Sequence, residues 1–186
     1  MVSLTTPVCD FGWKAVDFKL PGVDGKSYAL RDAMGANGLL VMFICNHCPY
    51  VKAIRPRLVH DLKELKEQHG IHAIAIMSND PAEYAEDSFD NMKQVAQEFG
   101  FSFPYVWDES QDVARAYGAV CTPDFFGFNR NFELQYRGRF DESRKDTAAE
   151  GARRDLFEAM KEVAQTQAGP REQIPSMGCS IKWRNG

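Results

Sequence analysis

The sequence predicts an α/β protein in which helices enclose a β-sheet. The continuous apolar run at residues 39–44 is typical of a strand that is buried on both faces, and residues 71–77 are predicted to form a second buried strand. Apolar side chains recur at helical spacing within 50–69 and 88–99, and each of these helices follows one of the two strands. Strands that alternate with helices in this way form a sheet sandwiched by helices.

Turn and capping residues set the limits of the individual elements. Gly70 ends the first long helix, and we expect Ser88 to cap the second. We expect one domain over residues 1–186, with an N-terminal hairpin extension at 1–31 and an extended C-terminal tail at 169–186. The expected elements are, in order, hairpin strands 18–20 and 27–30, strand 39–44, helix 50–69, strand 71–77, helix 88–99, extended segment 104–107, helix 111–117, paired strands 125–128 and 134–139, and helix 148–167.

Composition and charge exclude several classes of function. The chain has 44% hydrophobic and 26% charged residues and a formal net charge of -4. This charge offers no basic surface to nucleic acid, and no apolar stretch approaches the ~18 residues of a membrane span. The first residues lack the basic and apolar regions of an export signal. Five cysteines are few and odd in number, so we expect a protein of the reducing cytoplasm; the oligomeric state stays open.

Cys45 and Cys48 carry the strongest chemical signal. They follow a buried strand and precede a helix, so the helix N-terminus presents N–H groups and its positive dipole end to the sulfurs. Both effects favour the thiolate, which is the nucleophile of disulfide exchange. Half of a zinc site and two core cysteines are the alternatives, but no second cysteine pair or spaced histidine pair completes a zinc site. The pair therefore predicts redox chemistry.

Two neighbouring residues bear on the reactivity of the pair. His47 lies between the cysteines, where a partly protonated imidazole stabilises a thiolate and makes the disulfide more oxidising; a solvent-facing residue without effect is the alternative. Pro49 suits the first helical position, which makes Cys48 the N-cap. We expect Cys45 to attack a substrate disulfide and Cys48 to resolve the mixed disulfide.

The segment 121–124 is a second candidate site region. It lies between a helix and a strand, where a proline in a tight loop is a candidate cis peptide. Beside the cysteine pair, such a loop leaves the Thr122 backbone free to hold a partner peptide in a strand-like contact. Thr122 and Pro123 are therefore candidate substrate-binding residues, and an ordinary trans-proline turn is the alternative.

Weaker signals come from charged residues and from the tail. Three charged residues are expected on a solvated strand edge: Arg137, Arg139 and Asp141. Ile181 and Trp183 alternate with polar residues, which indicates an extended segment that docks by one apolar face. Cys179 in this segment is a candidate third redox thiol, and packing as a small buried hydrophobe is the alternative.

The chain resembles the thioredoxin superfamily, and specifically the peroxiredoxin-like branch of the alkyl hydroperoxide reductase/thiol-specific antioxidant group. The resemblance covers nearly the whole chain and implies a thioredoxin-like fold with a central mixed β-sheet and a cis-Pro123 loop. It also implies that Cys48 and Pro49 correspond to the peroxidatic cysteine and the proline that follows it. The segments that carry it are 16–20, 24–26, 43–51, 78–80, 86–89, 103–105, 117–124, 136–139 and 178–183.

Three departures from these relatives bear on activity. Cys45 replaces the threonine expected three residues before the peroxidatic cysteine, and Thr122 and Pro123 occupy the region of an expected arginine. Those two residues activate and hold a peroxide in the family, so their absence favours thiol exchange. Strand 39–44 also carries no buried acid of the thioredoxin kind, which leaves Asp124 or water as the proton relay for the resolving cysteine.

These observations predict a thiol–disulfide oxidoreductase that uses a Cys45/Cys48 dithiol–disulfide couple. The first alternative is a peroxiredoxin-like thiol peroxidase that uses Cys48. The second is a copper- or zinc-binding module built from Cys45, Cys48 and His47. The expected partner is a disulfide-containing protein or a small-molecule thiol. The redox reading requires no cofactor and no metal, and we expect no nucleic-acid or membrane partner.

Overall fold

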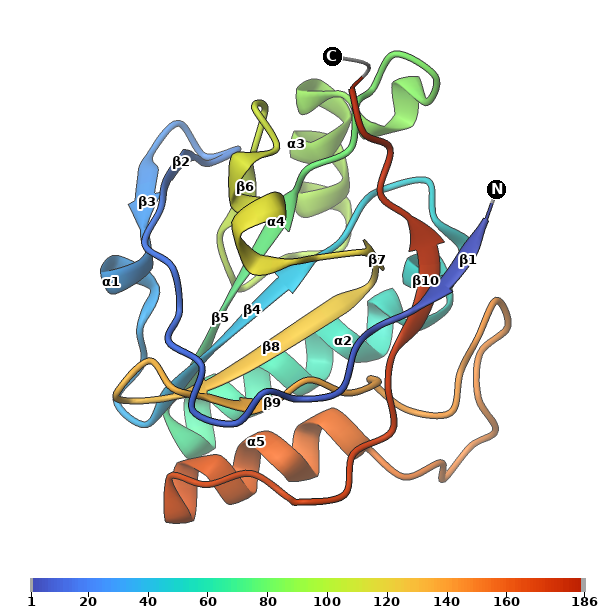
Figure 1. Ribbon diagram of the computed structural model, residues 1–186. Helices are drawn as coiled ribbons and strands as arrows, with labels where there is room; N and C mark the ends of the chain where they lie inside the picture. Colours follow the sequence, from blue (N-terminus) through green and yellow to red (C-terminus); the bar gives the residue numbers. More distant parts are fainter. Residues whose placement is uncertain (1, 185–186) are drawn as a thin grey trace.

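A mixed sheet of five strands forms the centre of the computed structural model, which describes residues 2–184 (Figure 1). Residues 1 and 185–186 of the expected domain lie outside this described part. The strands are β4 (Gly38–Phe43), β5 (Ile71–Met77), β6 (Tyr105–Trp107), β8 (Asp124–Asn129) and β9 (Leu134–Tyr136), in the order β6-β5-β4-β8-β9. β4, β5 and β6 are parallel, whereas β8 is antiparallel to β4 and β9. The predicted central mixed sheet is confirmed.

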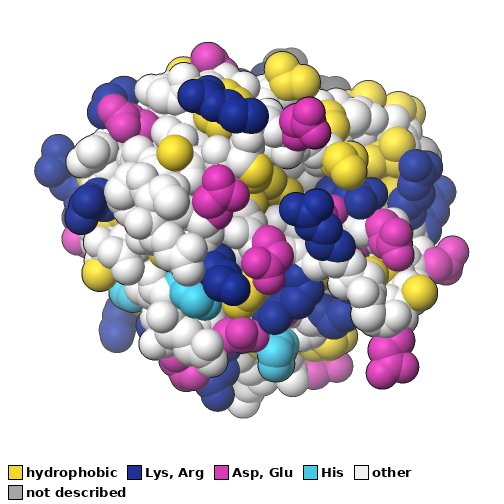
Figure 2. Space-filling view, turned by 90° about the horizontal axis from the view of Figure 1, so that it is seen from below, with side chains coloured by type: hydrophobic (Ala, Val, Ile, Leu, Met, Phe, Trp, Pro, Cys, Tyr) yellow, Lys and Arg dark blue, Asp and Glu magenta, His cyan; other side chains and the backbone are white. Residues whose placement is uncertain are grey.

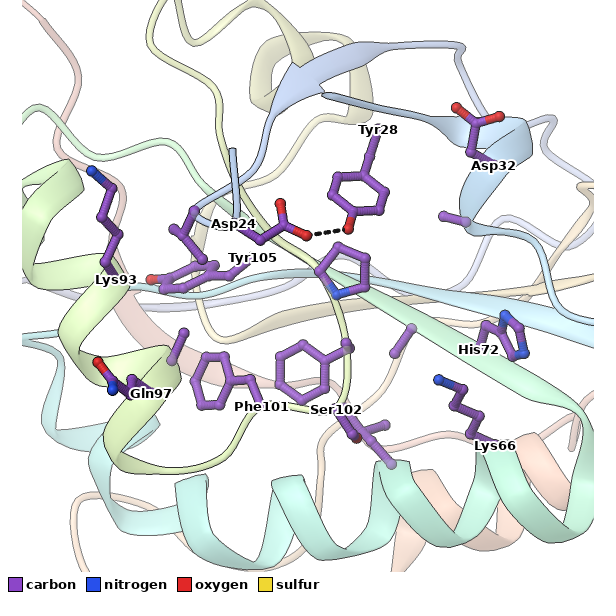
Figure 3. Close-up of a pocket in the computed structure, with 17 residues that line it drawn as sticks. Asp24, Tyr28, Asp32, Lys66, His72, Lys93, Gln97, Phe101, Ser102 and Tyr105 are labelled. Carbon is purple, nitrogen blue, oxygen red and sulfur yellow. Dashed lines mark hydrogen bonds between the residues drawn. The ribbon is translucent and has the colours of Figure 1, made fainter. Parts of the chain in front are cut away.

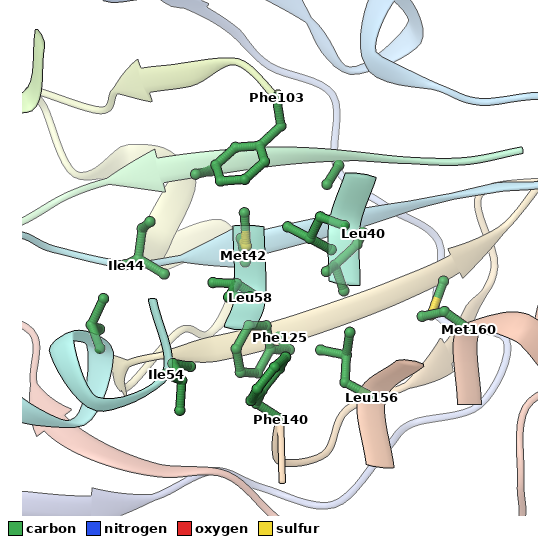
Figure 4. Packing of buried hydrophobic residues seen from close by; sticks show 14 of the residues in the cluster. Leu40, Met42, Ile44, Ile54, Leu58, Phe103, Phe125, Phe140, Leu156 and Met160 are labelled. Atoms are coloured by element: carbon green, nitrogen blue, oxygen red, sulfur yellow. The ribbon is translucent and has the colours of Figure 1, made fainter. Parts of the chain in front are cut away.

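Side chains of β4 alternate between two hydrophobic cores, one on each face of the sheet. Leu40 and Met42 pack with the side chains of two helices on one face, as Figure 4 shows, and Leu39 and Val41 pack on the other. Burial of both faces explains why β4 is a continuous apolar run. The first core contains α2 (Pro49–His69) and α5 (Asp155–Thr166), and the second contains α1 (Leu30–Ala33) and α4 (Asp112–Tyr117).

The predicted elements are confirmed except at the last helix and at the end of the predicted strand 134–139, which stops at Tyr136. The hairpin consists of β2 (Lys19–Pro21) and β3 (Ser27–Ala29), and Ser88 caps α3 (Phe89–Glu98) by accepting a hydrogen bond from Asn91 N. The prediction of a helix from residue 148 is wrong, because α5 begins at Asp155. Gly151 has a φ of +82°, which a right-handed helix excludes, and residues 147–154 bury no apolar face.

Both ends of the chain meet in a separate small sheet. It consists of β1 (Ser3–Thr5), β10 (Met177–Ser180) and β7 (Cys121–Thr122), with β10 antiparallel to both neighbours (Figure 1). The sequence predicted the docked tail but not β1. Ile181 is buried, as the alternating pattern predicts, whereas Trp183 is 37% exposed, so the apolar face ends after Ile181.

The prediction of a solvated strand edge at residues 137–141 is wrong. β9 ends at Tyr136, and Arg137 turns into the protein, where its Nη2 lies 3.0 Å from Asp124 Oδ2. Asp141 is also buried and pairs with Arg57, while the partly exposed Arg139 pairs with Asp155 at 2.7 Å. Sequence periodicity does not reveal these pairs, because each joins residues from different elements.

The surface carries charges of both signs. On the face seen from below in Figure 2, Lys and Arg side chains are interspersed with Asp and Glu side chains. Between residues 2 and 184, no helix combines the length and the apolar composition needed to cross a bilayer.

Candidate active site

The end of β4 and the start of α2 position Cys45 and Cys48. Ile44 N donates to Ile76 O and extends the contact between β4 and β5, after which the chain leaves the sheet. Cys48 is the N-cap of α2 in an extended conformation, and Pro49 occupies the first turn, as predicted. The Cys48 carbonyl accepts hydrogen bonds from the N–H groups of the first turn. The second cysteine therefore lies at the positive end of a 21-residue helix.

Three cysteine side chains and one threonine form a buried cluster. Cys45, Cys48 and Cys179 are 1%, 0% and 1% exposed. Cys48 Sγ lies 2.9 Å from Cys179 Sγ and 3.1 Å from the Thr122 carbonyl oxygen. Cys45 Sγ lies 3.2 Å from Thr122 Oγ1. The Thr122–Pro123 peptide is cis and lies beside the cysteine pair, as predicted.

The three thiols differ in acidity. Hydrogen bonds from Cys179 and from Cys45 lower the pKa of Cys48 well below that of an ordinary thiol. Burial raises the pKa of Cys45, and its bond to Cys48 and the charge of Asp87 raise it further. Donation to Cys48 also raises the pKa of Cys179. As a thiol, Cys48 donates to the Thr122 carbonyl, which opposes a charge on its sulfur. Donation by the Cys45 and Cys179 thiols and the helix N-terminus favour that charge. Cys48 thus has the lowest pKa of the three thiols, whereas the sequence favoured Cys45 as the attacking thiol.

His47 is buried and bonded, so the solvent-facing alternative is excluded. Its Nδ1 lies 2.6 Å from Asp87 Oδ2 and 3.7 Å from Cys45 Sγ, and its ring stacks on Tyr84 with the centroids 4.0 Å apart. A carboxylate only accepts hydrogen bonds, so Nδ1 carries the proton of this bond. The contacts of His47 therefore run to Cys45 and Asp87, not to Cys48.

Asp87 is a functional candidate that the analysis of the sequence missed. It ends the short helix η1 (Ala85–Asp87) and is fully buried. Its Oδ1 accepts from the backbone N of Asn46 and of His47, at 2.8 and 3.2 Å, and its Oδ2 accepts from Asn79 Nδ2 at 2.9 Å. Burial alone would raise the pKa of Asp87, but the bonds from His47 and Asn79 outweigh it and lower the pKa. A buried carboxylate therefore holds the loop between the two cysteines.

The structure does not bring Asp124 to the cysteine pair. Asp124 is opposite Phe43 in the sheet, and Phe43 belongs to the core on the face away from α2. The Asp124 carboxylate accepts hydrogen bonds from Arg137 and from Val120 N, and within residues 2–184 none of its hydrogen bonds reaches Cys45 or Cys48. The acid that lies beside the cysteine pair is therefore Asp87, which comes from another element, and not Asp124.

Thr122 is not free to hold a partner peptide, in contrast to the expectation from the sequence. Cys179 is opposite Thr122, and Ser180 is opposite Cys121, so β10 occupies the backbone edge beside the cis peptide. Ser176 Oγ also donates to Pro123 O at 2.9 Å. The chain's own tail thus fills the position that we expected for a substrate strand.

The side chains that could bind a metal in the structure differ from the set expected from the sequence, which was Cys45, Cys48 and His47. Ligand atoms of Cys45, His47 and Asp87 lie within 4.8 Å of one another, and Cys48 does not belong to this group. His47 Nδ1 and Asp87 Oδ2 already satisfy each other, so a metal would have to break that bond. The arrangement therefore fits a hydrogen-bonded relay better than a prepared metal centre.

A pocket of about 660 Å³ lies away from the sulfurs, between the hairpin, α3 and the edge of β5 and β6 (Figure 3). Its lining includes the bonded pair Asp24 and Tyr28, and its floor is aromatic. Tyr105 connects it to the cysteine loop, because its hydroxyl donates to Asn46 Oδ1 at 3.0 Å. The pocket contains no cysteine side chain.

Comparison with known proteins identifies the family. Residues 11–140 match the model of the AhpC/TSA family, which is more than half of the chain. The chain belongs to the AhpC/TSA family. The match includes Cys45, Cys48, Asp87 and Thr122 but ends before β10, so Cys179 lies beyond the segment that identifies this AhpC/TSA protein.

Relatives of this AhpC/TSA protein include redox proteins. It is 30% identical over 123 residues to thiol-disulfide oxidoreductase ResA of Halalkalibacterium halodurans, a match that covers 66% of this chain and 65% of the relative. The chain thus spans slightly less than two thirds of that relative's length.

Solved structures confirm the predicted thioredoxin-like fold. An uncharacterized conserved protein from Geobacillus kaustophilus is 40% identical, with a TM-score of 0.94 and coverage of 100% of this chain and 98% of its own. The thioredoxin domain of a thiol-disulfide oxidoreductase from Bacteroides vulgatus shares the fold at 20% identity, with a TM-score of 0.57 and coverage of 72% and 89%.

Proposed function

We propose that this protein is a thiol–disulfide oxidoreductase whose Cys45/Cys48 couple exchanges electrons with a disulfide-containing protein or a small-molecule thiol. The placement of Cys48 carries this proposal. Its sulfur lies at the N-terminus of α2 beside the cis-Pro123 loop, and it forms hydrogen bonds with the thiols of Cys45 and Cys179. The names of the ResA relatives support the same class of reaction. We also propose a place in the reducing cytoplasm, because the cysteines of the sequence are few and odd in number.

The proposed reaction is an exchange in two steps. The Cys48 thiolate attacks one sulfur of the substrate disulfide, forms a mixed disulfide and releases the other substrate sulfur as a thiolate. The Cys45 sulfur then attacks Cys48 Sγ, forms the Cys45–Cys48 disulfide and releases the second substrate thiolate. Two electrons pass from the dithiol to the substrate, which leaves as a dithiol. The nearest free acceptor for the Cys45 proton is the Asp87 carboxylate, because His47 Nδ1 already carries a proton.

Turnover of a protein disulfide tests this function. Reduced protein with dithiothreitol should accelerate the reduction of insulin, and it should consume hydrogen peroxide slowly. Fast consumption of hydrogen peroxide without insulin reduction would favour the thiol peroxidase that uses Cys48 instead.

The low pKa of Cys48 predicts an oxidising couple. Stabilisation of one thiolate favours the dithiol form, so the reduction potential should lie between about −270 mV, the value of thioredoxin, and about −180 mV, the value of disulfide isomerase. Equilibration with glutathione redox buffers, read by alkylation of free thiols, measures this potential. A value clearly more negative than that of thioredoxin would contradict the stabilised thiolate.

Replacement of Asp87 tests the proton acceptor. Asp87→Asn removes the carboxylate that faces Cys45 and His47, and loss of a general base slows a proton transfer by about 10²–10⁴-fold. We expect slower closure of the Cys45–Cys48 disulfide, with the deficit shrinking as the pH rises, because hydroxide then takes the Cys45 proton. Rapid-mixing measurement of the mixed disulfide across a pH series checks this.

Glu86→Gln is the matched control, because Glu86 is the exposed neighbour of Asp87 and, within residues 2–184, its carboxylate forms an ion pair only with Lys52, at 3.5 Å. It should leave closure of the disulfide unchanged. A loss in Asp87→Asn that is equal at every pH would assign Asp87 a purely structural role.

A further inference from the structure

β10 brings a third cysteine into contact with the catalytic pair. Cys179 Sγ lies 2.9 Å from Cys48 Sγ, and Cys45 also bonds to Cys48, so Cys48 is the shared partner of both other thiols. The backbone holds this contact in place. Cys179 is opposite Thr122 in the small sheet, and a Cβ added to Gly178 would collide with the Thr122 carbonyl. The glycine therefore lets β10 approach the site closely.

β10 also has the geometry of a bound partner. It lies antiparallel on β7, next to the cis-Pro123 loop, and presents a cysteine to the Cys48 sulfur. β-strand addition is a common way to hold an extended peptide at a site. The segment that covers the site is thus itself a strand with a reactive side chain, and it comes from the same chain.

We propose that Cys48 has two alternative disulfide partners, Cys45 and Cys179, and that β10 acts as an internal partner strand whose thiol takes over the Cys48 bond. The proposal rests on the proposed function, because it uses the same Cys48 sulfur. It goes beyond a packing role for Cys179, which would leave the sulfur unreactive.

The exchange between the two disulfides is balanced within the chain. Starting from the Cys45–Cys48 disulfide, the Cys179 thiolate attacks Cys48 Sγ. The Cys48–Cys179 bond forms, the Cys45–Cys48 bond breaks, and Cys45 leaves as a thiolate that takes up the proton lost by Cys179. Two sulfurs remain oxidised before and after, so no external oxidant or reductant is needed. In the new state Cys45 is free and β10 is covalently attached to the start of α2.

Disulfide mapping of Cys45→Ser tests the proposal, because this variant leaves Cys48 with Cys179 as its partner. The reduced variant is treated with oxidised glutathione, alkylated, digested with trypsin and analysed by mass spectrometry. Trypsin places Cys48 in peptide 32–52, Cys179 in peptide 172–182 and Cys121 in peptide 116–130. We expect a cross-link between peptides 32–52 and 172–182, and a fall in free thiols from four to two. Four is the chain's five cysteines less the one replaced.

Two double variants serve as controls. Cys45→Ser/Cys179→Ser should stop at a glutathione adduct on Cys48. Cys45→Ser/Cys121→Ser removes a different buried cysteine and should keep the cross-link. Wild-type protein, which needs no substitution to fold, should yield the same cross-linked peptides as a minor species beside the Cys45–Cys48 disulfide.

A glutathione adduct on Cys48 of Cys45→Ser, with Cys179 free, would overturn the role of Cys179 while leaving the proposed function intact. Failure of the wild-type protein to form the Cys45–Cys48 disulfide or to reduce insulin would instead overturn the proposed function. The Cys45→Ser variant therefore tests the role of Cys179, and the wild-type protein tests the proposed function.

Discussion

Cys48→Ser should abolish disulfide exchange. The pKa of Cys48 is lower than those of Cys45 and Cys179, and serine at this position is not ionised, so we expect kcat/KM for insulin reduction to fall by at least about a thousandfold. Stopped-flow or turbidity assays with dithiothreitol as the reductant measure the loss. The matched control is Cys9→Ser, because Cys9 is half-buried and lies outside the three-cysteine cluster.

Cys45→Ser separates the two orders of attack. With Cys48 as the attacking thiolate, this variant should still form a mixed disulfide with a substrate, whereas Cys48→Ser should not. The reverse result would show that Cys45 attacks first, as the sequence alone suggested.

Arg137→Met should strongly destabilise the fold. Asp124 is fully buried and Arg137 is its cationic partner, so removal of the guanidinium leaves an unpaired carboxylate inside the protein. Breaking a buried pair in this way lowers the free energy of unfolding by about 3–5 kcal/mol. Urea denaturation measures the change, and Arg130→Met, at an exposed position, should leave stability nearly unchanged.

The destabilisation should depend on pH in a defined direction. Burial raises the pKa of Asp124 even with Arg137 present, and loss of Arg137 removes the charge that opposes this rise. A carboxyl with a raised folded-state pKa destabilises the fold above its unfolded pKa of about 3.9, so acidification should recover stability. The double variant Asp124→Leu/Arg137→Met should also recover most of the loss. If the loss of unfolding free energy in Arg137→Met were the same at every pH and were not recovered by Asp124→Leu, the result would contradict a charge effect.

The framework of the fold could be predicted because short stretches of the sequence determine its strands and helices. β4 and β5 are apolar on both faces, and α2 and α3 have helical spacing and recognisable ends at Gly70 and Ser88. The same reasoning placed Cys48 at the N-cap and predicted the cis peptide before Pro123. Local rules failed where a left-handed glycine at position 151 interrupts a helical pattern.

The parts of the site that could not be predicted depend on contacts between distant segments. Asp87 is 40 residues from His47 in sequence, and nothing in the sequence around it indicates that its carboxylate binds the cysteine loop. Cys179 is 131 residues from Cys48. The alternation at Ile181 and Trp183 predicted a docked extended tail that carries Cys179, but it did not predict the pairing with β1 and β7 that brings this thiol to Cys48.

The small sheet has a consequence for the order of synthesis. The central sheet, α2 and the cis-Pro123 loop are all encoded before residue 140, whereas β10, which covers the sulfurs, is encoded later, at Met177–Ser180. Domains fold as the chain emerges, starting from the N-terminal side. The cysteine pair of a nascent chain is therefore open to oxidants and to other thiols until residues 177–180 have emerged, and it is covered only when β10 pairs with β1 and β7.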